Sequence, residues 1–353
     1  MKISIAADIH LGIPNRLDDI IWALRKMADY NKAHNIKHLV ILGGLLHDRE
    51  QMGIKDLCAI TELLEEIQST YKQEVIAFPG NHDMYMKNSW DITSLRPLSK
   101  HLTYINTVSA IEIGGHKIWI LPFIHYEADY MKAFKKIKKQ AKKGDYLFTH
   151  IGVRGAKLNS CFLLKSWSVV DLGNNPFAAI YAGHFHNFQQ VGNNMYYVGS
   201  PIPFKFDEGD VDHGFIVLDL DKNEHEFVSI WDGVKDGPPQ FMTLDDKMLK
   251  SKTQEEISGN IVRVALFEEY TNHQMAEMRQ YLEGLGAKTV RFINWASKED
   301  KEAIELAKNN AATASELFKR FVEADKKGVK ELNQAILLKL NNEITAEGDR
   351  RYV

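Results

Sequence analysis

The chain has 353 residues, of which 44% are hydrophobic and 26% are charged, and its formal net charge is −3. These values are typical of a globular protein, and the length predicts a main domain with smaller additions. Two cysteines are too few for a disulfide framework, and the sequence has no apolar run as long as a membrane span. Because a predicted strand begins at residue 2, we expect no cleavable signal peptide and a cytoplasmic location.

Strands and helices alternate over residues 1–231, which predicts a layered α/β domain. Apolar side chains recur at helical spacing over 17–34 and 54–71, so both segments are predicted helices. Buried strands are predicted at 2–7, 38–42, 74–78, 146–148 and 178–181, and hairpins at 109–121, 189–198 and 214–230.

Polar segments follow the five buried strands. They are Asp8-Ile9-His10, Gly43-Gly44-Leu45-Leu46-His47-Asp48, Gly80-Asn81-His82-Asp83, Thr149-His150 and Gly183-His184-Phe185-His186. A rigid sheet can hold the loops at its strand ends in fixed geometry, so ligands far apart in the sequence can converge. Carboxylate, imidazole and amide oxygen suit manganese, zinc or iron better than calcium. Two such ions about 3.5–4 Å apart can clamp a phosphodiester and lower the pKa of a shared water.

These segments resemble the calcineurin-like metallophosphoesterase superfamily, whose signature is D-x-H, GD, GNH[DE], H and G-H-x-H in this order. The resemblance covers residues 1–230 and is closest to nuclease subunits of the SbcD type, including phage versions. Two further features are similar to that type: Arg49 after the second segment, and Tyr197-Val198-Gly199-Ser200-Pro201 beyond the last. The resemblance implies a β-sandwich of two mixed sheets flanked by helices.

The resemblance also implies the role of each polar residue. Asp8, His10 and His186 would bind a first divalent metal, and Asn81, His150 and His184 a second. Mn²⁺ is the expected ion, with Mg²⁺, Zn²⁺ or iron as alternatives. His82 would stabilise or protonate the leaving oxygen, Asp83 would orient His82, and His47 would assist it.

Gly44 departs from the family pattern. Its position is that of the aspartate that bridges both metals, and glycine offers no ligand atom. Removing this carboxylate takes one negative charge from between two dications, so their repulsion is less screened. We therefore expect a weakly bound second metal and hydrolysis that is much reduced or absent. Asp48 is expected to lie past the turn and not to replace the missing ligand.

A linker rich in Gly, Lys, Asp and Pro is predicted at 232–239, followed by a strand at 260–267, a helix at 271–285 and a strand at 287–295. The resemblance implies that residues 240–296 form a small α+β capping domain that grips DNA. A packing module that does not touch the substrate is the alternative.

The segment 297–353 shows no strand pattern and predicts short helices with single apolar faces. The resemblance implies that this helical tail binds an SMC-like ABC ATPase of the SbcC type, with intramolecular packing as the alternative. The lysine-rich helix around 132–143 offers either local basic surface for phosphates or a solvated helix face.

Together, these features predict a metal-dependent exonuclease or endonuclease subunit of an SbcCD-like nuclease–ATPase complex. It would act on DNA in end processing, recombination or repair, as a homodimer within a heterotetramer. The alternatives are a non-catalytic architectural subunit of the same complex and a small-molecule phosphodiesterase.

Overall fold

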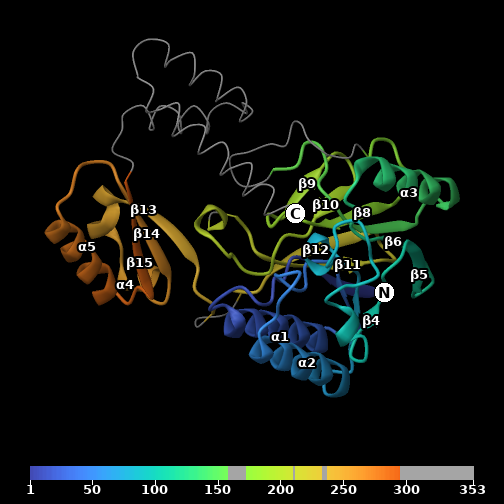
Figure 1. The fold of residues 1–353 in the computed structure, drawn as a ribbon, viewed down its shortest axis with the longest axis horizontal. Helices are drawn as coiled ribbons and strands as arrows, with labels where there is room; N and C mark the ends of the chain where they lie inside the picture. Colours follow the sequence, from blue (N-terminus) through green and yellow to red (C-terminus); the bar gives the residue numbers. More distant parts are fainter. Residues whose placement is uncertain (158–171, 210, 233–236, 295–353) are drawn as a thin grey trace, which may run out of the picture.

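The computed structural model describes residues 1–157, 172–209, 211–232 and 237–294. Within these ranges, two six-stranded sheets pack face to face with helices outside them, and a three-stranded sheet forms a separate unit (Figure 1). The predicted α/β sandwich of two mixed sheets flanked by helices is confirmed. None of the helices in these ranges has both the length and the apolar character needed to cross a bilayer.

The first sheet carries two of the predicted metal loops and the GNHD segment. Its order is β12 (Glu224–Ser229), β11 (Gly214–Asp219), β1 (Lys2–Ala6), β2 (His38–Ile41), β3 (Glu74–Ala77) and β4 (Thr103–Tyr104). The run from β1 to β4 is parallel, so the carboxyl ends of β1, β2 and β3 meet at one edge. Helices α1 (Leu17–Ala33) and α2 (Ile54–Ser69) cover the outer face.

The second sheet supplies the remaining predicted ligands. Its order is β5 (Ser109–Ile113), β6 (His116–Leu121), β7 (Tyr146–His150), β8 (Ala179–Gly183), β10 (Met195–Tyr197) and β9 (Gln189–Val191). Helix α3 (Glu127–Gln140) packs on its outer face through Tyr130, Phe134 and Ile137. Strands β7 and β8 stay paired as far as His150 and Gly183, so His150 lies on a strand and not in the loop predicted to follow it.

The alternation of side chains along β1 explains how the two layers assemble. Ile3 and Ile5 face the core between the sheets, whereas Ala6 faces α1 and α2. All three are fully buried. A strand that is covered on both faces must place polar side chains at its end, and Asp8 is the first residue beyond β1 able to do so.

The three-stranded unit has its own apolar core. It consists of β13 (Phe241–Asp245), η4 (Asp246–Ser251), α4 (Gln254–Ile257), β14 (Ile261–Leu266), α5 (Asn272–Gly284) and β15 (Thr289–Asn294), and its strands are all parallel. Thr271 caps α5, since its hydroxyl accepts from the backbone N–H of Gln274. The β13 strand was not predicted from the sequence. The predicted tail at 297–353 lies outside the described residues.

This unit contacts the main body next to the last metal loop. A short 3-10 helix, η3 (Phe206–Glu208), places the Phe206 ring 5.0 Å from the ring of Phe241 on β13. The guanidinium carbon of Arg263 lies 4.6 Å from the centre of the same Phe206 ring. Two more 3-10 helices, η1 (Asn81–Asp83) and η2 (Arg96–Leu98), follow β3.

Candidate metal centre

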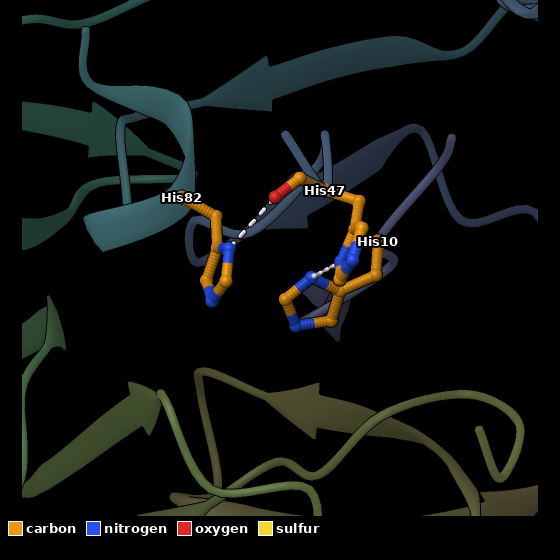
Figure 2. Close-up of side chains that lie close together, drawn as sticks. All are labelled: His10, His47 and His82. Atoms are coloured by element: carbon orange, nitrogen blue, oxygen red, sulfur yellow. Dashed lines mark hydrogen bonds between the residues drawn. The ribbon is translucent and has the colours of Figure 1, made fainter. Parts of the chain in front are cut away.

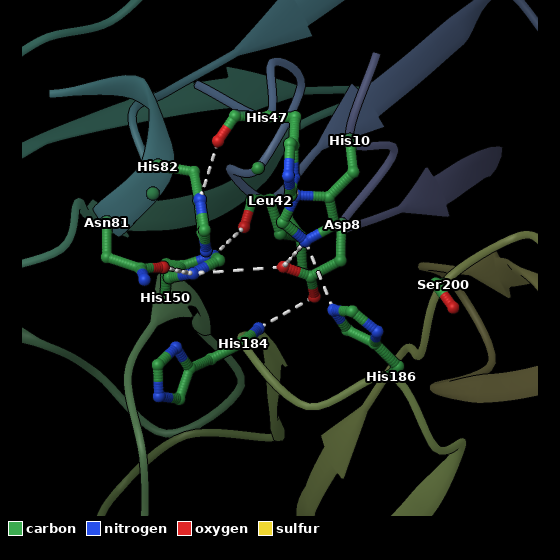
Figure 3. Close-up of polar contacts among 12 residues, drawn as sticks. Asp8, His10, Leu42, His47, Asn81, His82, His150, His184, His186 and Ser200 are labelled. Carbon is green, nitrogen blue, oxygen red and sulfur yellow. Dashed lines mark hydrogen bonds and ion pairs between the residues drawn. The ribbon is translucent and has the colours of Figure 1, made fainter. Parts of the chain in front are cut away.

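The loops after β1 and β2 run side by side. The backbone N–H of Asp8 donates to the carbonyl of Gly43 (3.0 Å), and that of His10 donates to the carbonyl of Gly44 (2.9 Å). Asp8 and His10 both have a φ of 51°, in the left-handed region that non-glycine residues adopt only where surrounding contacts impose it. The paired loops thus direct both side chains into one space (Figure 3).

Asp8, His10 and His186 form the first group of ligands. One donor atom from each lies within 4.8 Å of the others, and the Nε2 atoms of His10 and His186 are 3.1 Å apart. Burial, and then the neighbouring imidazoles, hold the pKa of His10 well below its usual range, so its ring is neutral at pH 7. A carboxylate with two imidazoles suits a divalent transition ion once both rings offer a lone pair. Both Nε2 atoms would have to be free of a proton for His10 and His186 to hold a metal ion, so its binding would release the proton of this hydrogen bond.

Asn81 and His150 form the core of the second group. The Nδ1 atom of His150 lies 2.7 Å from the Leu42 carbonyl, which can only accept, so Nδ1 carries a proton. In the neutral imidazole, Nε2 then presents its lone pair toward Asn81 Oδ1, 2.8 Å away. Two buried acceptors that face each other fit a bound cation. The His184 ring lies 5.4 Å from that of His150, and its backbone N–H donates to Asp8 Oδ2 (2.7 Å).

Asp8 lies between the two groups. Its Oδ1 atom is 3.9 Å from Nε2 of His10 and also 3.9 Å from Nε2 of His150. The same oxygen fills the space beside Gly44: a Cβ at that glycine would lie 2.7 Å from Asp8 Oδ1 and 2.9 Å from Asp8 Cα. The position of the missing family aspartate is therefore closed by Asp8. Asp48 faces its own turn, where its carboxylate accepts from the backbone N–H groups of Glu50 and Gln51.

Asp83 holds the backbone of the site and does not hold His82. Its carboxylate accepts hydrogen bonds from the backbone N–H groups of Gly44 (2.6 Å), Gly80 (2.9 Å) and Leu46 (3.0 Å). The expectation that Asp83 orients His82 was wrong, because both of its carboxylate oxygens face these amides. Burial raises the pKa of Asp83, although the three amides oppose the shift. Asp83 thus joins the loop after β2 to the one after β3.

The backbone of the neighbouring loop orients His82. Its Nδ1 donates to the carbonyl oxygen of His47 (2.8 Å), and its ring meets that of His10 edge-on with centres 4.6 Å apart (Figure 2). Burial lowers the pKa of His82 to about 3, so the ring is neutral at pH 7. His47 lies parallel to it, and His10, His47 and His82 make a second set of donors within 4.8 Å. His10 belongs to both sets, facing His186 through Nε2 and His47 through Nδ1.

Glu208 is a site residue that the sequence did not reveal. Only 2% of this residue is exposed, and its Oε1 accepts a hydrogen bond from His186 Nδ1 (2.8 Å). Its Oε2 accepts from the backbone N–H of Phe204 (2.8 Å). When a histidine binds a metal through one ring nitrogen, a carboxylate hydrogen-bonded to the other nitrogen fixes the orientation of the ring. It also makes the imidazole more basic and so a stronger ligand. No motif surrounds Glu208, which lies 22 residues beyond His186, so only the folded structure reveals it.

We expect the substitution Glu208→Gln to weaken binding of the first metal by about 10- to 100-fold, the usual effect of losing such a partner. Titration calorimetry of the metal-free protein with MnCl₂ measures this affinity. Asp207→Asn is the matched control, because Asp207 is an exposed neighbour paired with Lys205. Equal affinities for wild type and Glu208→Gln would show that the carboxylate does not support the ligand.

The same variant also predicts a pH dependence in the metal-free protein. Burial opposes the charge on both partners, but the ion pair prevails, lowering the pKa of Glu208 to about 2 and raising that of His186 above 6.5. The contribution of Glu208 to the free energy of unfolding is present above pH 4.5 and is lost as the pH falls toward 2. The contribution of His186 is lost as the pH rises through its raised pKa. The stability difference between wild type and Glu208→Gln should therefore peak between pH 4.5 and 6.5. A constant difference would contradict this linkage.

The calcineurin-like phosphoesterase family matches residues 1–188, more than half of the chain, so this protein belongs to that family. The SbcD component of the SbcCD nuclease of Staphylococcus epidermidis is 23% identical over 253 residues, 64% of this chain and 67% of that protein. A "Putative phosphoesterase 244L" of Invertebrate iridescent virus 6 is 23% identical over 185 residues, 51% of this chain and 62% of that protein.

Similar solved structures include GAP50 of Plasmodium, at 13% identity and a TM-score of 0.39, with 65% of this chain and 88% of that chain covered. A likeness at this level carries no argument about function. Family membership supports phosphoesterase chemistry with divalent metals in general, and the described residues include Asp and His groups able to hold such an ion.

Proposed function

We propose that this chain is a metal-dependent phosphodiesterase that cleaves DNA strands, with Mn²⁺ as its preferred ion. The observation that carries the proposal is the convergence of two donor groups on opposite sides of Asp8. The likeness to a nuclease component over 64% of the chain favours DNA over other phosphodiesters. We assign Asp8, His10 and His186 to one ion, and Asn81, His150 and His184 to the other, with Asp8 as the single carboxylate between them.

We assign a separate role to each protein residue around this centre. Bound metals would supply a polarised phosphoryl group and a water of lowered pKa. His82 is neutral until an anion lies beside it, and a neighbouring phosphate would favour its protonated form. It can then stabilise or protonate the leaving oxygen, with His47 fixing its ring through the backbone carbonyl. Asp83 keeps both loops in place, and Glu208 keeps His186 in place.

The likeness to a component of the SbcCD nuclease supports a wider assignment. We propose that the protein works with an SMC-like ABC ATPase in DNA end processing, recombination or repair in the cytoplasm. Residues 240–296 would serve as the capping domain and 297–353 as the ATPase-binding segment, within a heterotetramer that contains a homodimer of this chain. The contact between Phe206 of η3 and Phe241 of β13 supports the capping assignment, because Glu208 at the end of η3 is hydrogen-bonded to His186.

A second candidate function follows from Gly44. Without the family carboxylate, the same fold would serve as a non-catalytic architectural subunit that binds DNA and the ATPase. The preserved surroundings oppose this alternative, because a decaying site loses several ligands and this one departs from the family signature at a single ligand position.

A strand-cleavage assay tests the proposed function. Labelled duplex DNA with free ends should be cut by the wild type in Mn²⁺ when the ATPase partner is present, although slowly because Gly44 offers no ligand. Chelation of the metal, or the substitution His82→Ala, should leave the DNA intact. Intact DNA, together with full metal occupancy by elemental analysis, would establish the architectural alternative. Turnover of a cyclic nucleotide without any cleavage of DNA would establish a small-molecule phosphodiesterase.

A further inference from the structure

A cavity of about 520 Å³ lies beside the second group of donors, and none of those donors lines it. It is lined mainly by the segment after η1 and by the loop between β6 and α3, including Met84, Lys87, Trp90, Asn106, His125 and Tyr126. We propose that this cavity, the flank pocket, binds an unpaired nucleobase of the DNA strand whose phosphodiester lies at the metal centre. The inference rests on the proposed function and adds the structure of the preferred substrate.

Aromatic rings connect the flank pocket to the metal centre. The rings of Tyr126 and His125 meet edge-on with centres 4.9 Å apart, and the His125 ring lies 6.5 Å from that of Phe123. Phe123 in turn lies 6.2 Å from the ring of His184, parallel to it, and 6.1 Å from that of His150. The ring of Phe123 therefore lies between the flank pocket and a DNA strand bound at the second group of donors.

The Trp90 side chain fixes one wall of the pocket. Its indole N–H donates to the carbonyl of Phe123 (2.8 Å), which joins the segment after η1 to the loop after β6. Tyr126 lines the cavity and is 54% exposed. A rigid indole and an open phenol ring on one cavity provide flat surfaces that stack on any base.

The charges around the flank pocket favour a base over a phosphate. Lys87 is the cation on its wall, whereas Asp91 and Asp129 provide two carboxylates, so a phosphate inside would meet net negative charge. Carboxylates and the Asn106 amide can instead accept and donate hydrogen bonds at base edges. Lys87 on the wall of the pocket is the cation available to an adjoining phosphate.

Binding of fluorescent oligonucleotides to the full chain in the absence of divalent metal tests the inference. We expect Tyr126→Ala to weaken binding of a single strand by about 5- to 100-fold, the effect of losing one stacked base, with little change for blunt duplex. Tyr126→Phe should restore single-strand affinity. Tyr85→Ala is the matched control, because Tyr85 is also an exposed tyrosine, at 50%, but does not line the cavity.

A second measurement locates the base. A single strand carrying 2-aminopurine at successive positions should show quenching at one position in the wild type and none in Tyr126→Ala. An abasic site at that position should remove the difference between the two proteins. Single-strand binding that is unchanged in Tyr126→Ala, or weakened equally for blunt duplex, overturns the flank pocket alone. A wild type that binds neither form of DNA overturns the proposed function itself.

Discussion

In an Asp8→Ala variant, we expect both metal ions to be lost together. Asp8 Oδ1 is equally distant, at 3.9 Å, from the nearest donor nitrogen of each group, and it is the carboxylate that lies between them. Removing a partner outside the coordination shell already costs about 10- to 100-fold in affinity, so removing this shared ligand should cost more than about 100-fold. Calorimetric titration with MnCl₂ and elemental analysis after dialysis measure the affinity and the number of ions.

Two further variants separate charge from shape. Asp8→Asn keeps an oxygen for the His184 backbone N–H but loses the negative charge, so it should fold like the wild type and still bind metal poorly. Asp48→Asn removes a carboxylate that faces its own turn and should change neither affinity nor stoichiometry. If Asp8→Ala lost one ion and retained the other at wild-type affinity, Asp8 would not be shared between the two groups.

For Gly44→Asp, we expect the metal-free protein to be destabilised by about 1–3 kcal/mol, because an aspartate must adopt a φ of +68° and its Cβ meets Asp8. Manganese should then stabilise this variant more than the wild type, since a second carboxylate would screen the repulsion between two cations. Thermal unfolding with and without MnCl₂ measures both effects, and faster DNA cleavage in Mn²⁺ should accompany the added carboxylate.

Gly44→Ala is the matched control for this substitution. It brings a Cβ to the same place at the same backbone angle without a ligand atom, so it should lose stability and gain nothing extra from manganese. Equal responses of the Asp and Ala variants to manganese would show that the new carboxylate does not reach the ions. A metal-free Gly44→Asp protein as stable as the wild type would contradict the close approach of Asp8.

The sequence predicts most of the fold because the signals are local and repeated. Helix α1 begins at the predicted residue Leu17 and ends one residue earlier than predicted, as its apolar face alone specifies its length. Strand β13 was missed because Phe241–Asp245 begins two residues after Pro239, at the end of a segment whose pattern indicates a linker. It is a strand because β14 pairs with it along its whole length, a long-range contact that leaves no periodic signature in five residues.

The candidate site is predictable as a set of residues but not as a network. Motif order was enough to bring Asp8, His10 and His186 together, whereas their assignment to metal ions is still a prediction. The resemblance implied that Asp83 orients His82, and the structure gives that place to the His47 carbonyl. A backbone carbonyl leaves no sequence signal, because every residue has one. Glu208 belongs to no motif, so its hydrogen bond to His186 could not be read from the sequence.

The turn η3 joins two parts of the molecule that are far apart in the sequence. One end of it, Glu208, holds the ring of His186, and the other end, Phe206, lies against Phe241 and Arg263 of the three-stranded unit. A rotation of that unit would therefore strain or release the imidazole that we assign to the first ion. By thermodynamic reciprocity, occupancy of the ion changes the orientational freedom of the unit by the same free energy.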